Sequence, residues 1–378
     1  MMNQEVTEKL THLRQELHQY PELSGQEADT AARIKTFFEA LYPDEVYSQI
    51  GGEGIFFLFN GNIPGPTTLL RSELDGLPIK ELTIGKHSSR YPGKSHTCGH
   101  DGHMAILCGV GQALADQRPI RGKVVLLFQP AEETGEGASK VINSPVFSQL
   151  NIDYAFALHN LPGYGLHEII LKKDTFTAAS KGMVIQLKGR TSHAAHPEDG
   201  NSPAASMARI ILGLQRLPDQ IPDFSMVTVV NAVLGEISFG TSPGEAIIRA
   251  TLRSFDNQIM DKLTHLAEEL VQKVGRDEKI SVSFSYTEAF RTTVNHPEAL
   301  QIVLKAASQI DLPVRHTDTP FRWSEDFGQF SRITKTMLFG LGAGKTQPQL
   351  HEGIYDFPDG LIPTGVKMFK EIIKQIHH

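Results

Sequence analysis

The sequence predicts an α/β protein built on a largely parallel sheet, with a smaller α+β domain inserted into it. The chain has 378 residues, which is more than one hydrophobic core usually organises. Up to about residue 160, apolar runs typical of buried strands alternate with helical patterns. From Gly182 onward the order changes to strand, helix, strand, strand, helix, strand. These three observations together indicate two domains of different class.

Two amphipathic helices are predicted at the beginning of the chain. Residues 5–18 place their apolar side chains on one helical face, and a second apolar face runs from Ala28 to Leu41. Ser24 and Glu27 have the spacing of a capping box, in which two side chains cap the first backbone N–H groups of a helix. We therefore expect this box to start the second helix.

Three apolar runs are typical of strands that are buried on both faces of a sheet. They comprise residues 68–74, 123–128 and 154–158. Helical patterns separate them. Because a parallel connection needs such a crossover, the alternation favours a largely parallel sheet.

The inserted domain is predicted to span residues 181–290. Its strands are expected at 183–188, 226–234, 245–253 and 280–286. One helix is expected to begin at residues 201–203, and a second carries its apolar side chains from Ile259 to Val274. This β-α-β-β-α-β order is the ferredoxin-like arrangement. The α/β domain then comprises residues 1–180 and 291–378, and it ends in a helix at 360–376.

Composition excludes several classes of partner. The chain has 43 acidic and 36 basic residues, a net charge of −7 and no basic run, so nucleic acid is not expected as a ligand. Cys98 and Cys108 form no CxxC pair and no disulfide framework, which favours a reducing compartment. The polar amino-terminal segment lacks a signal-peptide core, and no run of 18 apolar residues occurs. We therefore expect a cytoplasmic protein without a membrane partner.

Polar side chains follow each of the three buried runs. Asp75 follows the first run, Glu132 and Glu133 follow the second, and His159 ends the third. In open α/β sheets, ligands bind beyond the carboxyl ends of the strands. If the three strands are neighbours, these side chains converge on one crevice.

The segment 96–103 holds three imidazoles, a thiol and a carboxylate around two glycines. These groups are the usual ligands of zinc and neighbouring divalent metals, and a loop that bends at glycine can turn Cys98 and His100 toward one point. The alternative is a polar loop in which Asp101 caps the helix that follows. Asp101 and His103 also suit a supporting shell that orients the ligands.

Glu132 and Glu133 are adjacent, so their carboxylates point in different directions on an irregular turn. One can bind a metal while the other transfers protons, as metal-assisted hydrolysis requires. Two solvated loop glutamates are the alternative. His159 and His351 are weak candidates by themselves, but a dinuclear site needs more ligands than the other residues supply. His193 lies in the insert, so its relevance depends on whether the insert reaches the crevice in its own chain or a partner chain.

The motifs resemble those of the metal-dependent aminoacylase and carboxypeptidase family that includes hippurate hydrolase, aminobenzoyl-glutamate hydrolase and the plant indoleacetyl-amino-acid hydrolases. The similarity spans nearly the whole chain, and the combination and order of the motifs are highly specific. They are LRSELDGLPI (70–79), HTCGHDGHMA (96–105), FQPAEETGEGA (128–138), ALHN (157–160), SHAAHP (192–197), SEDF (324–327) and LHEGIYDF (350–357).

The resemblance implies a zinc-exopeptidase-like catalytic domain with two divalent ions, most simply zinc or manganese, with nickel or cobalt as alternatives. The metal ligands it implies are Cys98, His100, Glu133, His159 and His351. Glu132 is then the general base and acid, Asp75 orients the site, and His193 contacts the reacting carbonyl group and stabilises its oxyanion. The insert serves as lid and as the interface of a homodimer.

Two segments depart from the family pattern. Residues 239–245 replace the usual Asn-Val-Ile-Pro-Asp, which puts the substrate contacts of that segment in doubt. Arg253, which follows, could pair with a substrate carboxylate as a bidentate fork, or be a surface arginine on a strand. Glu73 stands where relatives often have aspartate, and we expect little functional cost.

The expected function is hydrolysis of an N-acyl amino acid to a carboxylate and a free amino acid. A dipeptidase or carboxypeptidase, including an N-acetyl-diaminopimelate deacetylase, would use the same site with different pockets. A third possibility is a catalytically silent homologue that binds a metal or small ligand. The complete set of candidate ligands argues against this third possibility.

Overall fold

The computed structural model describes residues 3–378, which divide into two compact units. The first unit contains the chain up to Phe176 together with residues 293–320 and 326–378, and the second contains residues 177–292 and 321–325. The expected insert, residues 181–290, lies within the second unit. Residues 321–325 join it because the backbone N–H of Ala178 donates to the carbonyl oxygens of Phe321 and Trp323, at 3.0 and 3.1 Å.

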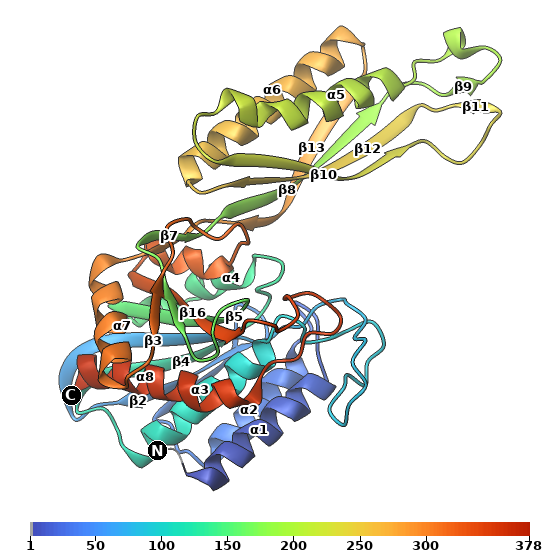
Figure 1. Ribbon diagram of the computed structural model, residues 1–378. Helices are drawn as coiled ribbons and strands as arrows, with labels where there is room; N and C mark the ends of the chain where they lie inside the picture. The colour runs from blue at the N-terminus through green and yellow to red at the C-terminus, as the bar shows by residue number, and fades with distance from the viewer. Residues whose placement is uncertain (1–2) are drawn as a thin grey trace. The chain divides into compact units, whose positions relative to one another are not determined.

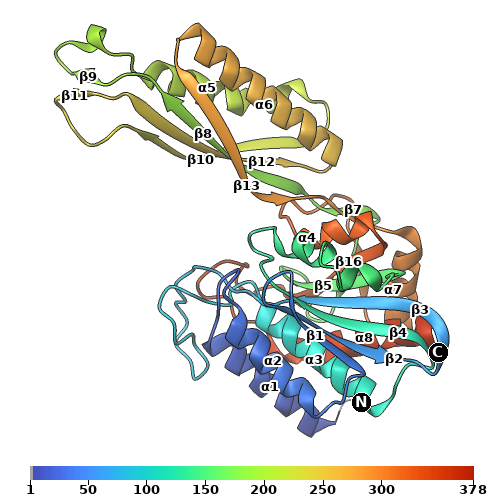
Figure 2. The ribbon, with the colours of Figure 1, turned by 180° about the vertical axis from the view of Figure 1, so that it is seen from behind.

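An eight-stranded sheet organises the first unit, in the order β1-β2-β4-β3-β5-β16-β6-β15 (Figure 1). Its strands are β1 (Glu45–Ile50), β2 (Gly54–Asn60), β3 (Ile63–Glu73), β4 (Arg121–Gln129), β5 (Tyr154–Pro162), β6 (Ile169–Leu171), β15 (Val314–His316) and β16 (Lys335–Gly344). The central strands β4, β3, β5 and β16 run parallel, and β1 and β2 add an antiparallel edge, seen in Figure 2. The predicted mostly parallel α/β sheet is confirmed.

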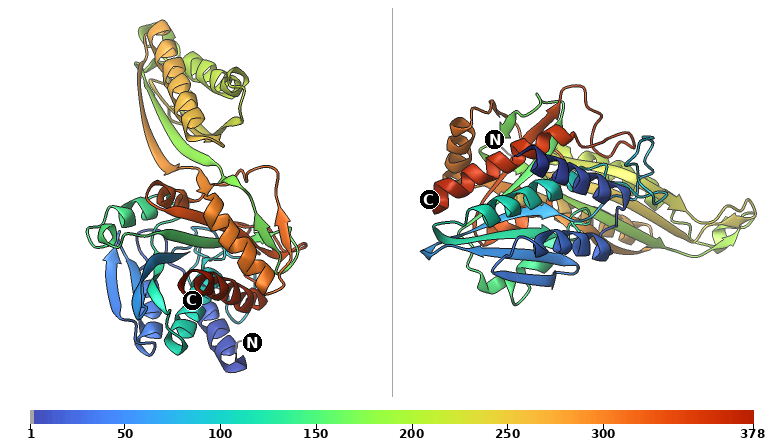
Figure 3. Two further views of the ribbon diagram at one scale, coloured as in Figure 1. Left: turned by 90° about the vertical axis from the view of Figure 1, so that its left-hand side faces the viewer. Right: turned by 90° about the horizontal axis from the view of Figure 1, so that it is seen from below.

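Five helices share the hydrophobic core of this unit with the sheet. They are α1 (Gln4–Gln19), α2 (Ala28–Glu39), α3 (His100–Asp116), α7 (Pro297–Gln309) and α8 (Ile362–His377). The right-hand view of Figure 3 shows α1, α3 and α8 side by side. Helix α3 is buried from its first residue to Gly111, so the side chains at its amino-terminal end lie inside the protein. The short helix α4 (Gly137–Ile142) packs on the 3-10 turn at Asp326–Arg332.

The predicted capping box of α2 is wrong, although the helix does begin at Ala28. Glu27 makes no capping bond, and the carboxylate of Glu22 instead accepts from the backbone N–H of Thr30 at 2.7 Å. Ser24 donates to the carboxylate of Asp75 at 2.7 Å, and Glu27 accepts from a distant backbone N–H. Ser24 and Glu27 therefore bond to buried polar groups from distant parts of the chain, and these bonds take the place of the predicted bonds to the start of α2.

The second unit has the predicted ferredoxin-like arrangement. Its main elements are β8 (Ala179–Lys188), α5 (Ala204–Arg216), β10 (Ser225–Leu234), β12 (Glu245–Ser254), α6 (Asn257–Asp277) and β13 (Ser281–Phe290). The strands form an antiparallel sheet in the order β10-β12-β8-β13, with a separate hydrophobic core under α5 and α6. The short strands β9 (Ser192–His193) and β11 (Thr241–Ser242) pair apart from this sheet. The fold class expected for the insert is confirmed.

The short strands β7 (Asp174–Thr177) and β14 (Thr293–Asn295) pair with each other and form a separate two-stranded sheet. Across residues 3–378, every helix is too short or too polar to cross a lipid bilayer.

Candidate metal centre

Three neighbouring parallel strands deliver polar side chains to one edge of the large sheet. Strand β3 lies between β4 and β5, and all three point the same way. Asp75 follows β3, Glu132 and Glu133 follow β4, and His159 lies near the end of β5. The convergence expected from the sequence is therefore present in the first unit.

The ligand atoms of six side chains form overlapping groups at this edge. In each group, one ligand atom from every residue lies within 4.8 Å of the others. Three groups contain only these six residues: Cys98 with His100 and His159, Cys98 with Glu133 and His351, and His100 with Glu132 and Glu133. Two further groups are Glu73 with His100 and His103, and Glu132 with Glu325 and Asp326. The structure thus brings together all five residues that were predicted to bind metal and the predicted general base.

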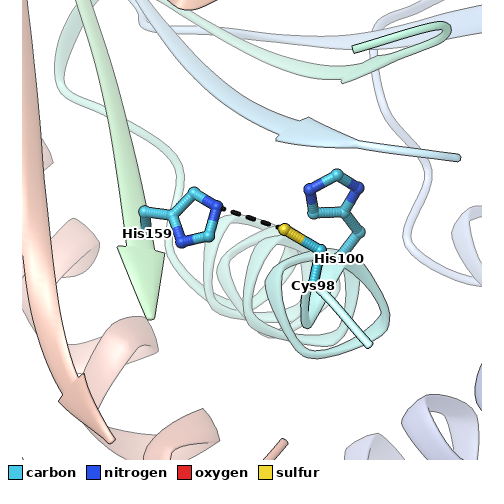
Figure 4. A group of neighbouring side chains, drawn as sticks. All are labelled: Cys98, His100 and His159. Carbon is cyan, nitrogen blue, oxygen red and sulfur yellow. Dashed lines mark hydrogen bonds between the residues drawn. The ribbon is translucent and has the colours of Figure 1, made fainter. Parts of the chain in front are cut away.

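The most buried of these groups is drawn in Figure 4. The thiol of Cys98 points at the ring of His159, with 3.6 Å between Sγ and Nε2, and the ring of His100 lies beside them. Glu133 extends the cluster outward, because its Oε1 lies 3.9 Å from Nε2 of His100 and 3.8 Å from Nε2 of His351. His351 has the most exposed side chain of the cluster, at 49%.

Both buried imidazoles are oriented by hydrogen bonds on their outer nitrogen. Nδ1 of His100 donates to the carbonyl oxygen of Asp75 at 2.8 Å, and Nδ1 of His159 donates to that of Asn160 at 3.0 Å. Each ring therefore turns Nε2 toward the cluster, and Nε2 of His100 is buried without a hydrogen-bond partner among the described residues. Such backbone bonds commonly orient metal-binding histidines. A thiol, imidazoles and a carboxylate arranged in this way fit a divalent metal ion of the zinc type.

The protonation states also suit a cation. Burial lowers the pKa of His159 to about 3 and that of His351 to about 4, so both rings are neutral and have a free electron pair. Burial, with Glu133 nearby, raises the pKa of the Cys98 thiol. Burial would lower the pKa of His100, but Cys98, Glu73 and Asp75 raise it above its usual range. A metal ion would replace the protons on Cys98 and His100.

Three turns that carry candidate ligands contain a residue in the left-handed backbone region. They are Gly99 (φ 93°), Ala131 (φ 51°) and His351 (φ 65°). At Gly99 a side chain would also collide, because an added Cβ would lie 2.6 Å from Oδ1 of Asn160. Left-handed non-glycine residues cost free energy and persist where the surroundings hold them. The turn at Ala131 is held by Glu27, whose Oε1 accepts from the Ala131 backbone N–H at 2.8 Å.

Asp75 connects two parts of the cluster. Its carboxylate accepts from the hydroxyl of Ser24 at 2.7 Å and from the backbone N–H of Glu133 at 2.9 Å, and its Oδ1 lies 3.6 Å from Nδ1 of His100. Burial raises the pKa of Asp75, but His100, Ser24 and the Glu133 N–H outweigh it and lower the pKa. Asp75 is therefore a buried anion that touches one imidazole and one ligand-bearing turn.

A second buried network, centred on Glu73, lies behind His159. Glu73 accepts from Nδ1 of His103 at 2.8 Å, and Nε2 of His103 accepts from the backbone N–H of Asn160 at 3.2 Å. Arg71 pairs with Glu73 and, at 2.7 Å, with Asp326. His103 therefore connects Glu73 to the backbone beside His159, and its ring nitrogen, a carboxylate oxygen of Glu73 and a ring nitrogen of His100 lie within 4.8 Å of one another. Arg71 was missed, although a charged residue inside an apolar strand run was a usable signal.

Asp101 does not cap α3, so that alternative is wrong. The residue before the helix is Gly99, and no side chain caps it. Asp101 lies inside the first turn, where its Oδ2 accepts from Nδ1 of His18 at 2.8 Å and from Nη1 of Arg14 at 3.3 Å. The side chains of Asp101 and His18 are fully buried. The start of α3 is thus anchored to α1 by a buried ionic pair.

This pair predicts a pH-dependent stability. Burial lowers the pKa of His18, but Asp101 and Glu81 outweigh it and raise the pKa to about 10, compared with 6.5 for an ordinary histidine. Because the folded state binds this proton more tightly, the pair's stabilisation is complete below about pH 6.5 and is lost as pH rises toward 10. We expect the free energy of unfolding of the metal-free protein to fall over this interval. Denaturant titrations at several pH values give the free energy of unfolding as a function of pH. Its slope against pH should differ between the wild type and His18→Gln over this interval, whereas His265→Gln, which changes an exposed histidine, should match the wild type.

His193 and Arg253 belong to the second unit and to none of the donor groups above. His193 is exposed on β9, and its Nδ1 accepts from the backbone N–H of Ala195 at 3.0 Å, so Nε2 carries the proton of the neutral ring. Arg253 donates to the carbonyl oxygen of Arg322 at 2.8 Å and to the hydroxyl of Ser324 at 3.0 Å. Arg253 is thus a partly exposed residue of strand β12 that is hydrogen-bonded to residues 322 and 324 of its own unit.

Comparison with known proteins adds independent findings. Residues 69–375 match the model of a family described as Peptidase family M20/M25/M40. N-acetyldiaminopimelate deacetylase of Priestia megaterium is 30% identical over 361 residues, which cover 93% of this chain and 95% of that protein. Hippurate hydrolase of Campylobacter jejuni is 27% identical over 364 residues, which cover 95% and 94%.

A solved structure shares the fold over nearly the whole length. It is the Bacillus subtilis YXEP protein, described as a dinuclear metal binding peptidase from the M20 family. The TM-score is 0.84 at 23% identity, with 99% of each chain covered. At this identity the likeness concerns the fold.

Proposed function

Because this chain belongs to peptidase family M20/M25/M40, we propose that it is a metal-dependent amidohydrolase that cleaves the amide bond of an N-acyl amino acid. Membership confirms the family resemblance seen in the sequence and the expected enzyme class, a hydrolase of amide bonds. The observation that carries the proposal is the buried cluster in which Cys98, His100 and His159 meet the Glu132–Glu133 turn. Relatives that deacetylate N-acetyldiaminopimelate and hydrolyse hippurate support a substrate of the N-acyl amino acid class.

We propose two divalent ions per chain, held by Cys98, His100, Glu133, His159 and His351. The overlap of the donor groups at Cys98, His100 and Glu133 supports two neighbouring positions. A thiolate favours a softer ion than magnesium, so zinc or manganese is the first choice, with nickel or cobalt as alternatives. When bound, such ions polarise a carbonyl group and make water a better nucleophile. Both cysteines are free, and Cys98 binds metal only when reduced, which favours a cytoplasmic location.

Glu132 is the proposed general base and acid. The backbone N–H of Asp326 donates to its Oε1 at 3.4 Å, and its Oε2 lies 3.9 Å from Nε2 of His100. Glu133 is the proposed ligand because it also reaches Cys98 and His351. Glu132 takes a proton from the attacking water as the new C–O bond forms. It returns that proton to the amine nitrogen as the C–N bond breaks, which releases a carboxylate and a free amine.

The second unit is proposed to complete the enzyme as a lid and homodimer interface. Its edge strand β10 carries exposed apolar side chains at Val230, Val233 and Leu234, which suits pairing with a second copy. His193 is proposed to donate to the oxyanion, and Arg253 to pair with the substrate carboxylate. Sedimentation of the purified protein as a monomer at micromolar concentration would exclude the homodimer.

Metal removal and a substrate panel test the proposed function. We expect chelation to abolish hydrolysis and zinc or manganese to restore it. Among N-acetyl amino acids, N-benzoyl amino acids, N-acetyl-diaminopimelate and dipeptides with a free amino end, the acylated compounds should be cleaved with the higher kcat/KM. Preferential cleavage of dipeptides would establish the dipeptidase alternative. Failure to bind metal or cleave any of them after reconstitution would favour the silent homologue.

A further inference from the structure

The turn that carries His351 has little regular structure of its own. His351 adopts the left-handed region, and residues 345–358 lie between strand β16 and the 3-10 turn at 359–361 without a helix or strand. Backbone bonds hold it at two points. The N–H of His351 donates to the carbonyl oxygen of Thr97 at 3.0 Å, and the N–H of Leu82 donates to that of Gly353 at 2.6 Å. A strained turn of this kind needs further support from its surroundings.

Arg14 of α1 supplies a buried connection to this turn. Its Nη1 lies 2.6 Å from Oδ1 of Asp356 and its Nε lies 2.8 Å from Oδ1 of Asp359, both in the segment after His351. The same Nη1 reaches Asp101, next to His100, at 3.3 Å. The Arg14 side chain is only 1% exposed. One guanidinium therefore joins the start of α3 to the segment that follows His351.

We propose that Arg14 is a positioning residue of the metal centre. It fixes the position of the turn that carries His351 relative to His100. The inference rests on the proposed function, because it assumes that both histidines bind metal. A planar guanidinium can serve several carboxylates at fixed angles, which a lysine ammonium cannot reproduce.

The exposures of the three carboxylates determine where the loss of Arg14 acts. Asp101 is fully buried and keeps its bond to His18, so the start of α3 stays anchored. Asp356 and Asp359 are 36% and 32% exposed, so their carboxylates can turn partly toward water, while His87 at 2.9 Å from Asp356 and Gln15 at 3.0 Å from Asp359 remain as partners. Because Tyr355 and Phe357 stay buried, the loss of Arg14 loosens the segment after His351 without releasing it from the core. The effect is therefore expected at His351 and at the ion that this histidine binds.

The test compares Arg14→Met and Arg14→Lys with the wild type. Metal-free proteins are titrated with Zn²⁺ against a chromophoric chelator, and hydrogen exchange of residues 345–361 is followed. We expect Arg14→Met to weaken one of two Zn²⁺ affinities about 10- to 100-fold, as losses of supporting partners do. Arg14→Lys should be intermediate, and exchange of the segment should accelerate. Excess Zn²⁺ should restore activity, because the weakened site fills again at a higher free-ion concentration.

Arg121→Met is the matched control. Arg121 donates to the carbonyl oxygen of Ile376 near the end of α8, so its loss should alter stability and leave both Zn²⁺ affinities unchanged. If Arg14→Met does not fold, the double variant Asp356→Ala and Asp359→Ala removes the same two contacts from the exposed side. Folded variants with wild-type Zn²⁺ affinities and exchange would overturn the inference. A wild type that binds no Zn²⁺ would instead overturn the proposed function.

Discussion

Changing Glu132 to Gln should lower kcat by about 10²- to 10⁴-fold, the usual contribution of general acid–base catalysis, while bound metal stays at the wild-type level. The glutamine preserves the size of the side chain and can still accept from the Asp326 N–H, but it cannot take up and release the proton. Steady-state kinetics and elemental analysis on the same preparation would measure both quantities. A loss smaller than about tenfold would remove Glu132 from this role.

Glu136→Gln is the matched control for this experiment. Glu136 lies near the same turn, but it is exposed and pairs with Lys140 at 2.6 Å. We expect its kcat and metal content to remain at the wild-type level. If Glu132→Gln also loses metal, Glu132 is a ligand, a reading that its group with His100 and Glu133 would accommodate.

Changing His193 to Ala should lower kcat by about 10²- to 10³-fold, the usual effect of removing one oxyanion donor. The expectation follows from the Ala195 N–H bond, which leaves the proton of the neutral ring on the exposed Nε2. His196→Ala is the matched control, since His196 is an exposed histidine of the same loop that pairs with Glu198 at 3.4 Å. Equal kcat values for the two variants would contradict an oxyanion role for His193.

A mixture of two inactive variants identifies the chain that supplies His193. If His193 acts in the site of a neighbouring chain, dimers formed from His193→Ala and Glu132→Gln contain one complete site, and mixing should restore a substantial fraction of activity. If it acts in its own chain, the mixed dimers contain no complete site and activity stays low. The measurement is kcat after exchange of subunits.

Much of the fold and the candidate ligand set was determined by the sequence alone. Continuous apolar runs indicate buried strands. The polar residues that follow these strands lie at one edge of the sheet because parallel strands share a direction. Asp75, Glu133 and His159 could be located in this way, and Cys98 with His100 stood out because few structural needs explain so dense a run of ligand types. Helical and strand periodicity likewise predicted the ferredoxin-like insert.

Only the tertiary structure decided what the supporting residues do. Ser24 and Glu27 have the local spacing of a helix cap, yet they bond to Asp75 and to the Ala131 turn. Arg14 has no local signal at all, because its partners follow 73 to 345 residues later in the chain. A ligand type can be recognised from its own chemistry, but a buried polar group bonds to whichever partner the fold brings within reach. The sequence therefore determined the candidate ligands, and the fold decided what holds them.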